Sequence, residues 1–154
     1  MAASFTVERS TTIDAPPAAV YERIVDFHRW SAWSPFEELD PEMRRTFEGP
    51  ASGPGSIYHW SGNMKAGAGL MEMVEAVPGQ KVVIDQRNFK PTKSRAEVTF
   101  SLAPVGEGTS VTWSMVGRST TTTKLMGIFR SMDRMIGPVF EKGLANLKAD
   151  SEGA

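Results

Sequence analysis

The sequence has no cysteine and only two histidines, and both facts restrict its chemistry. Without cysteine there is no disulfide, no thiolate metal ligand and no cysteine nucleophile. Two histidines, His28 and His59, argue against a multi-histidine metal site. We therefore expect neither a metal nor a cofactor.

Long apolar runs and an excess of one charge are also missing. No stretch approaches the ~20 apolar residues of a transmembrane helix, and the first residues hold no apolar run of signal-peptide length. The formal net charge is −1, which argues against a broad basic surface for nucleic acid or anionic membranes. We expect a cytoplasmic protein that neither inserts stably into a membrane nor binds nucleic acid.

The rest of the composition is that of an ordinary globular domain, apart from its methionine and tryptophan. The 154 residues are 40% apolar and 23% charged, which suits a single domain over 1–154 with a core from about 4 to 149. Nine Met and four Trp supply adaptable side chains and large apolar faces. They either fill the core or line a cavity, and composition alone favours the core.

Hydrophobic periodicity predicts one strand, short helices, six more strands and a long final helix. Apolar residues at helical spacing predict helices over 18–27 and about 124–148. The three-residue spacing of Trp30, Trp33 and Phe36 predicts a short helical turn, which Pro35 limits. Apolar alternation and β-branched residues predict seven strands, at 5–13, 43–47, 56–63, 67–77, 81–89, 96–102 and 111–115.

This order of elements predicts an α+β fold with a seven-stranded antiparallel sheet. Strands joined by short turns pair antiparallel, and a sheet of this size twists and coils strongly. The final helix, about 37 Å long at ~1.5 Å per residue, is the only predicted element large enough to cover one face. Gly143 allows the sheet to approach this helix closely. A coiled sheet around one helix need not fill its concave side, and that space is the candidate pocket.

Several short motifs lie in a characteristic order along the chain: Ile13-Asp14-Ala15-Pro16, Phe27-His28-Arg29-Trp30, Gly53-Pro54-Gly55, Trp60-Ser61-Gly62-Asn63 and Phe140-Glu141-Lys142-Gly143-Leu144. Together they resemble the helix-grip superfamily of START lipid-transfer domains, polyketide cyclases and dehydratases, and birch-pollen-allergen proteins (the SRPBCC group). They look closest to its bacterial polyketide cyclase/dehydrase-type members. The resemblance implies one START-like domain whose curved sheet wraps around the C-terminal helix, with two short helices after the first strand. It also implies a cavity for apolar molecules, and it carries over no catalytic residue.

The concave face of the predicted sheet and the facing helix supply a candidate ligand site. Strand alternation places Tyr58 on the same face as Trp60 and points His59 the opposite way, although a slip of one residue exchanges the faces. Aromatic rings suit a flat apolar ligand because they offer stacking faces at low entropic cost. The predicted lining is Trp30, Trp33, Phe36, Tyr58, Trp60, Met71, Met73, Gln86, Phe100, Trp113, Met115, Phe129, Met132 and Ile136.

Four polar side chains are candidates for orienting a ligand inside such a pocket, namely Tyr58, Gln86, His59 and Arg45. His59 is the weakest of them because it points outward if Trp60 points inward. A buried Arg without a partner is costly. An inward Arg45 therefore indicates either an acidic group on the ligand or an internal carboxylate.

Three functions fit these observations. The first is a protein that binds a hydrophobic small molecule, such as a lipid, a polyketide or an aromatic metabolite. The second is a polyketide cyclase or dehydratase using the same cavity, with its catalytic residues unassigned because no Ser-His-Asp order, paired carboxylates or phosphate loop is visible. The third is a protein–protein module of the chaperone-activator type, which predicts an exposed apolar patch. A homodimer is left open.

Overall fold

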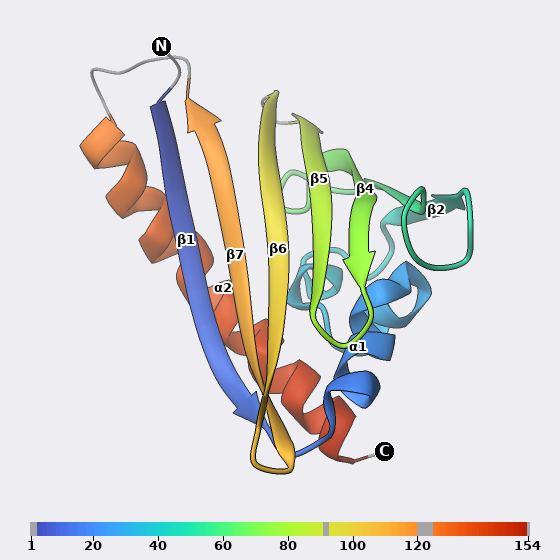
Figure 1. The fold of residues 1–154 in the computed structure, drawn as a ribbon. Coiled ribbons are helices and arrows are strands. Elements are labelled where there is room, and N and C mark those ends of the chain that lie inside the picture. Colours follow the sequence, from blue (N-terminus) through green and yellow to red (C-terminus); the bar gives the residue numbers. More distant parts are fainter. Residues whose placement is uncertain (1–2, 91–92, 120–124, 154) are drawn as a thin grey trace.

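The computed structural model describes the backbone of residues 3–90, 93–119 and 125–153, and their side chains except at 3–4, 38, 118–119 and 125–132. Its strands are β1 (Ala3–Ile13), β2 (Arg44–Glu48), β3 (Ile57–Ser61), β4 (Ala68–Val77), β5 (Lys81–Lys90), β6 (Ser94–Val105) and β7 (Gly108–Ser119). They form one seven-stranded antiparallel sheet in the order β1-β7-β6-β5-β4-β3-β2 (Figure 1). Apart from the β1–β7 pair, every neighbouring pair is consecutive in sequence, as expected for strands joined by short turns.

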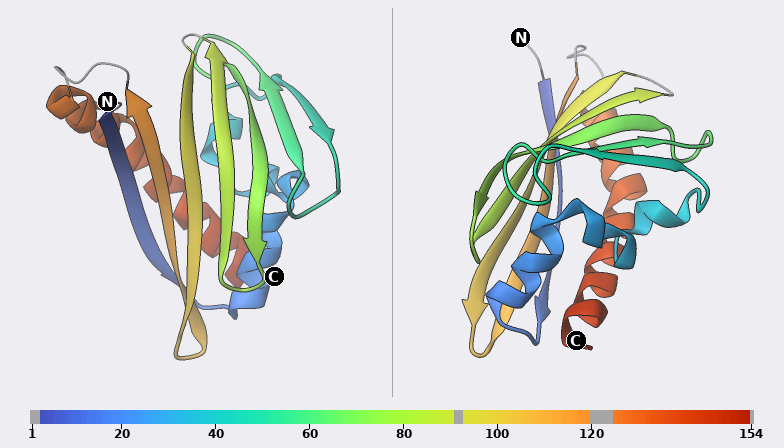
Figure 2. Two further views of the ribbon diagram at one scale, coloured as in Figure 1. Left: turned by 45° about the horizontal axis from the view of Figure 1, so that its top comes forward. Right: turned by 90° about the vertical axis from the view of Figure 1, so that its right-hand side faces the viewer.

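The described part of the chain also holds four helices: α1 (Pro17–Val25), the 3₁₀ helices η1 (Phe27–Ala32) and η2 (Pro35–Glu38), and α2 (Leu125–Glu152). The curved sheet, the short helices after β1 and the long C-terminal helix confirm the predicted α+β helix-grip fold (Figures 1 and 2). Among the described residues, no helix is both long enough and apolar enough to cross a membrane.

The predicted aromatic turn is two short 3₁₀ helices instead of one. A 3₁₀ helix repeats every three residues, so Trp30 and Trp33 are adjacent, with ring centroids 4.8 Å apart. Pro35 lacks an N–H and begins the second helix instead of extending the first. Phe36 therefore leaves the tryptophan pair and makes an edge contact with Trp113 on β7, at 6.4 Å between ring centroids.

Buried rings join the sheet to α2. Trp113 stacks on Phe140 of α2, with ring centroids 4.1 Å apart and planes 7° apart, and on Phe100 of β6 at 4.9 Å. The close approach predicted at Gly143 is confirmed, because a Cβ there would lie 2.6 Å from Trp113 Cζ3. The missing side chain thus makes room for the Trp113 ring against the helix.

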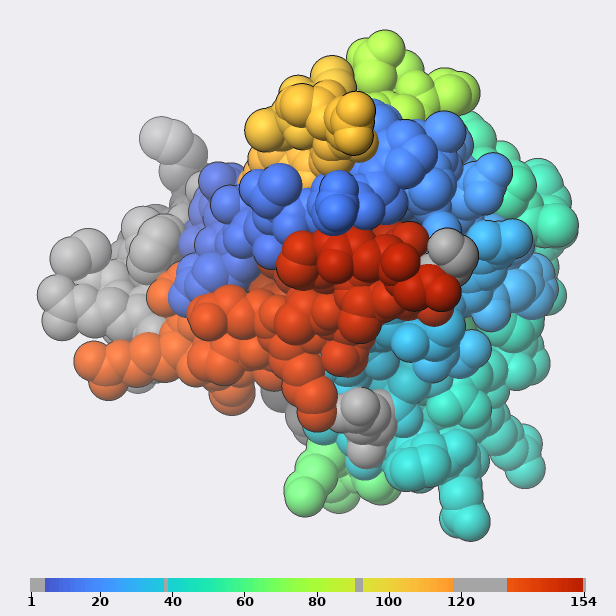
Figure 3. All heavy atoms as spheres, turned by 90° about the horizontal axis from the view of Figure 1, so that it is seen from below, coloured from blue at the N-terminus to red at the C-terminus, as the bar shows by residue number. Residues whose placement is uncertain are grey.

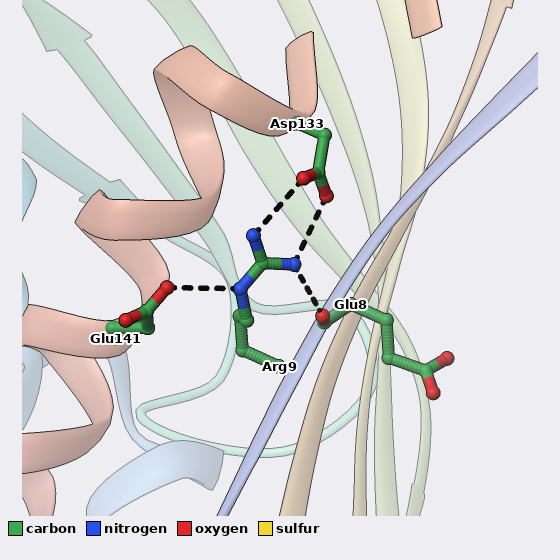
Figure 4. Close-up of polar contacts among 4 residues, drawn as sticks. All are labelled: Glu8, Arg9, Asp133 and Glu141. Atoms are coloured by element: carbon green, nitrogen blue, oxygen red, sulfur yellow. Dashed lines mark hydrogen bonds and ion pairs between the residues drawn. The ribbon is translucent and has the colours of Figure 1, made fainter. Parts of the chain in front are cut away.

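A charged cluster ties β1 to the middle of α2 (Figure 4). The Arg9 guanidinium donates to both Asp133 carboxylate oxygens, at 2.9 and 3.1 Å, and through Nε to Glu141 at 3.0 Å. It also donates to the carbonyl oxygen of Glu8 at 2.8 Å. Gly137 lies beneath the guanidinium, where a Cβ would be 2.2 Å from Arg9 Nη2. One basic side chain therefore links two turns of α2 to the edge strand.

We expect Arg9→Gln to weaken the acid dependence of stability. The hydrogen bond from Arg9 lowers the pKa of Asp133 below its ordinary value, which is about 4. The resulting stabilisation is present above that ordinary pKa and is lost as pH falls through the lower folded-state pKa. Thermal unfolding from neutral to acidic pH should show a smaller loss for Arg9→Gln than for wild type. The exposed control Arg134→Gln should follow wild type, and an unchanged acid profile in Arg9→Gln would contradict this coupling.

Candidate functional site

The concave face of the sheet is fully buried toward one end and partly exposed toward the other. Along β5, Ile84 is completely buried, whereas Gln86 and Asn88 on the same face remain partly exposed. Backbone register places Met71 opposite Gln86, and Gly69 opposite both Asn88 and Trp60. We call this part of the sheet the open end of the concave face. It is defined by four neighbouring inward side chains that are partly exposed: Trp60, Met71, Gln86 and Asn88.

The opposite end is closed by helices. Arg23 of α1 forms an ion pair with Asp150 of α2, with Nε and Oδ2 2.9 Å apart. Figure 3 views this end and shows α2 packed directly beside the N-terminal segment. Within the described residues, the most extensive packing of α2 is with β1, and Figures 1 and 2 show it running alongside that strand, away from β2 and β3. The helix thus leaves β3, β4 and β5 less closely covered.

A cluster of three polar side chains, Glu37, Arg45 and Tyr58, lies beside the open end. Glu37, on η2, accepts a hydrogen bond from the Tyr58 hydroxyl at 2.8 Å and another from Arg45 Nε. Arg45 is the register partner of Trp60, and its Nη1 also donates to the Met43 carbonyl oxygen at 3.3 Å. The Glu37 side chain is 10% exposed and that of Arg45 is 27% exposed. The inward Arg45 therefore has an internal carboxylate, one of the two alternatives that the sequence raised.

The electrostatics of this cluster keep Tyr58 protonated. Burial, together with the hydrogen bond to Glu37 and the charge of Glu37, raises the pKa of Tyr58 well above its ordinary value. Burial opposes the charge on Arg45, but the hydrogen bond and charge of Glu37 outweigh it and raise the pKa of Arg45. At neutral pH the Tyr58 phenol therefore keeps its single O–H, which it donates to Glu37, and the Arg45 guanidinium stays charged.

Uncharged amides extend the polar edge of the open end. Gln86 Nε2 donates to Asn88 Oδ1 at 3.2 Å, and Asn88 Nδ2 donates to Ser94 Oγ at 3.0 Å. The Trp60 ring lies over Gly69, where a Cβ would be 2.6 Å from Cη2. The Trp60 indole N–H donates to the Ala66 carbonyl oxygen at 2.9 Å. This packing contact and this hydrogen bond together position the ring at the open end.

The predicted ligand lining divides into three groups. The first is buried core and consists of Trp30, Trp33, Tyr58, Met73, Phe100, Trp113 and Met115. The second keeps partial exposure and consists of Phe36, Trp60, Met71, Gln86 and Ile136. The side chains of Phe129 and Met132 lie outside the described residues. Contact with a ligand stays a prediction for every member.

Three polar side chains bear on the predicted site. His59 faces away from Trp60, as strand alternation predicted, and its Nε2 pairs with Glu48. Sequence reasoning missed Glu37, because a four-residue helix gives no periodic signal; the need of Arg45 for a carboxylate was the clue. The Trp113 indole N–H is buried without a hydrogen-bond partner in the described part of the chain.

A separate depression of about 610 Å³ lies on the outer face of the sheet. Asp85 and Glu97 are register partners there and alternate with the buried Ile84 and Val98, which point the opposite way. Asp85 accepts hydrogen bonds from both Arg87 and Arg95, so its charge is already compensated. The depression is lined by Val74, Asp85, Arg95, Glu97 and Val116, and it is also bordered by Ile84 and Ala96, which are buried.

Comparison with known proteins agrees with this architecture. The family model described as polyketide cyclase / dehydrase and lipid transport matches residues 4–152. No curated protein matches the chain significantly. Three similar solved structures are Ara h 8.0201 (TM-score 0.70, 11% identity, 99% of this chain and 100% of that chain), the Aha1 dimer from Colwellia psychrerythraea (0.62, 18%, 96% and 96%) and DynU16 of the dynemicin biosynthetic locus (0.59, 13%, 93% and 45%). Identities this low show a shared fold and leave the chemistry to be argued from this chain.

Proposed function

The chain belongs to the polyketide cyclase/dehydrase and lipid transport family, and from this premise we propose that it binds a hydrophobic small molecule at the open end of its concave face. The supporting observation is that Trp60 and Met71 face inward yet stay partly exposed. When a ligand covers apolar surface that is in contact with water, the free energy of the system falls. Gln86 and the cluster of Glu37, Arg45 and Tyr58 supply the few polar groups that orient a ligand in such a site.

We expect Met71→Trp to weaken the binding of 2-naphthol, a flat apolar probe, by about 10-fold, or ~1.4 kcal/mol. Met71 lies between Tyr58 and Gln86 in the register of β3, β4 and β5, so a larger ring there occupies the space that the ligand needs. Isothermal titration calorimetry measures the affinity.

The control is Met64→Trp, because Met64 is 85% exposed and lies outside the strands. This control should bind 2-naphthol as wild type does. Thermal unfolding of both variants verifies that they are folded. Wild-type affinity in Met71→Trp would place the ligand elsewhere and contradict the proposal.

The polar cluster favours a second candidate, a cyclase or dehydratase that acts on a poly-β-carbonyl chain. Arg45 keeps N–H donors next to the open end beyond those bound to Glu37 and Met43, and such donors stabilise negative charge that develops on a carbonyl oxygen. A concave apolar face also holds a flexible chain in a reactive shape. Incubation with a linear poly-β-carbonyl compound, followed by mass spectrometry and NMR of the recovered ligand, separates the two candidates. If the protein is an enzyme, a new product forms faster than in buffer alone. If it is a binding protein, the compound is recovered unchanged.

A further inference from the structure

We infer that Glu37 makes this site select neutral ligands carrying a hydroxyl or carbonyl oxygen over ligands carrying a carboxylate. The inference rests on the proposed binding function and names the chemical class of its ligand. It starts from the hydrogen bond and ion pair between Glu37 and the inward Arg45. An arginine that faces an apolar site is ordinarily a receptor for an anion, and here that role is already taken.

The charge balance of the site disfavours an anion. Arg45 uses its Nε to bind Glu37, so the side-on fork that binds a carboxylate with two parallel bonds is occupied. A ligand carboxylate at Arg45 would also lie close to the Glu37 carboxylate, and like charges repel strongly where water is scarce. The four side chains of the open end, Trp60, Met71, Gln86 and Asn88, are uncharged and offset none of this repulsion.

The same groups suit a neutral oxygen. A guanidinium carries five N–H donors, and among the described residues Arg45 donates to Glu37 and Met43 and interacts with Tyr58. Further N–H groups are therefore available to a ligand carbonyl or hydroxyl oxygen. Each Glu37 oxygen accepts one described bond, so a remaining lone pair can accept from a ligand hydroxyl. A neutral ligand gains these bonds without placing a second negative charge beside Glu37.

The test compares two probes of similar shape, 2-naphthol and 2-naphthoate, which at neutral pH are neutral and anionic respectively. Calorimetric affinities are measured for wild type, Glu37→Gln and the control Glu42→Gln, which removes one charge from an exposed side chain. Wild type should prefer 2-naphthol. In Glu37→Gln, Arg45 no longer has a carboxylate partner. We therefore expect the affinity for 2-naphthoate relative to 2-naphthol to rise about 10-fold. Glu42→Gln should keep the wild-type ratio.

The outcomes separate this inference from the proposed function. If both probes bind and Glu37→Gln leaves their ratio unchanged, the selectivity role of Glu37 is overturned while apolar binding stands. If neither probe binds to any of the proteins, both ideas fail. Glu37→Ser provides a second variant should the glutamine variant not fold, because it removes the same charge and admits water to solvate Arg45. The same shift in ratio is expected from it.

Discussion

Replacing Trp113 with alanine is expected to lower the free energy of unfolding by about 3–5 kcal/mol. The side chain is 2% exposed and stacks between a ring of the neighbouring strand and a ring of α2, at 4.9 Å from Phe100 and 4.1 Å from Phe140. Alanine removes both contacts and leaves a cavity where the sheet meets the helix. Urea unfolding followed by far-UV circular dichroism measures the loss.

Trp113→Phe is the matched control for that prediction. It keeps an aromatic ring in the stack and removes the indole N–H that has no partner among the described residues. An unsatisfied buried donor costs about 1–3 kcal/mol, so its removal offsets part of the lost ring area. We expect a loss much smaller than that of the alanine variant. Equal losses for both variants would show that the stack is not what joins the sheet to α2.

Gly143→Ala is expected to destabilise the protein by about 1–3 kcal/mol, the usual cost of overpacking, although alanine favours helix over glycine by about 1 kcal/mol. A Cβ at this position would lie 2.6 Å from Trp113 Cζ3 and 2.9 Å from Pro35 Cδ. Both neighbours are rings held in place, so relief requires moving α2 away from the sheet. Urea unfolding measures this loss as well.

Gly137→Ala makes the same change in the same helix against a different neighbour. Its new Cβ would meet the Arg9 guanidinium, which can move only by loosening its partly exposed ion pairs with Asp133 and Glu141, and such pairs contribute little to stability. Both variants gain helix propensity over glycine, and the gain is smaller at residue 137 because Pro138 follows it. A smaller loss in Gly137→Ala would therefore report the more yielding neighbour. Gly137→Ala should lose clearly less stability than Gly143→Ala, and the reverse order would contradict the packing described here.

Sequence patterns predicted the fold well because they act through local geometry. In β6 the buried Val98 and Phe100 alternate with the exposed Glu97 and Ser101, and period-two alternation is a direct consequence of strand pleating. The length of α2 was predicted less well, since the helix ends at Glu152 instead of near Lys148. Glu152 accepts hydrogen bonds from the Asp14 backbone N–H and from Lys148. A tertiary contact thus holds the last turn of the helix. The periodicity of apolar residues carries no information about such a contact.

The candidate site was predicted only in part, for a physical reason. Alternation predicts which face of the sheet a residue lies on. It does not predict whether an inward residue lies at the end closed by helices or at the open end. Phe100 and Met71 both face inward, yet Phe100 is completely buried and Met71 is not. That difference depends on where α2 and the short helices lie, which is a property of the whole chain. The pairing of Glu37 with Arg45 is likewise a contact between two elements, so no local pattern marks it.

The most direct test of a binding site at the open end is an NMR titration with 2-naphthol, using protein labelled in its methionine and valine methyl groups. We expect the Met71 methyl signal to shift with ligand concentration, while the signals of the exposed Met64 and Met135 do not. If the Met71 signal stays fixed and those of Val74 and Val116 shift instead, the ligand binds in the depression on the outer face. That result would contradict the proposed site.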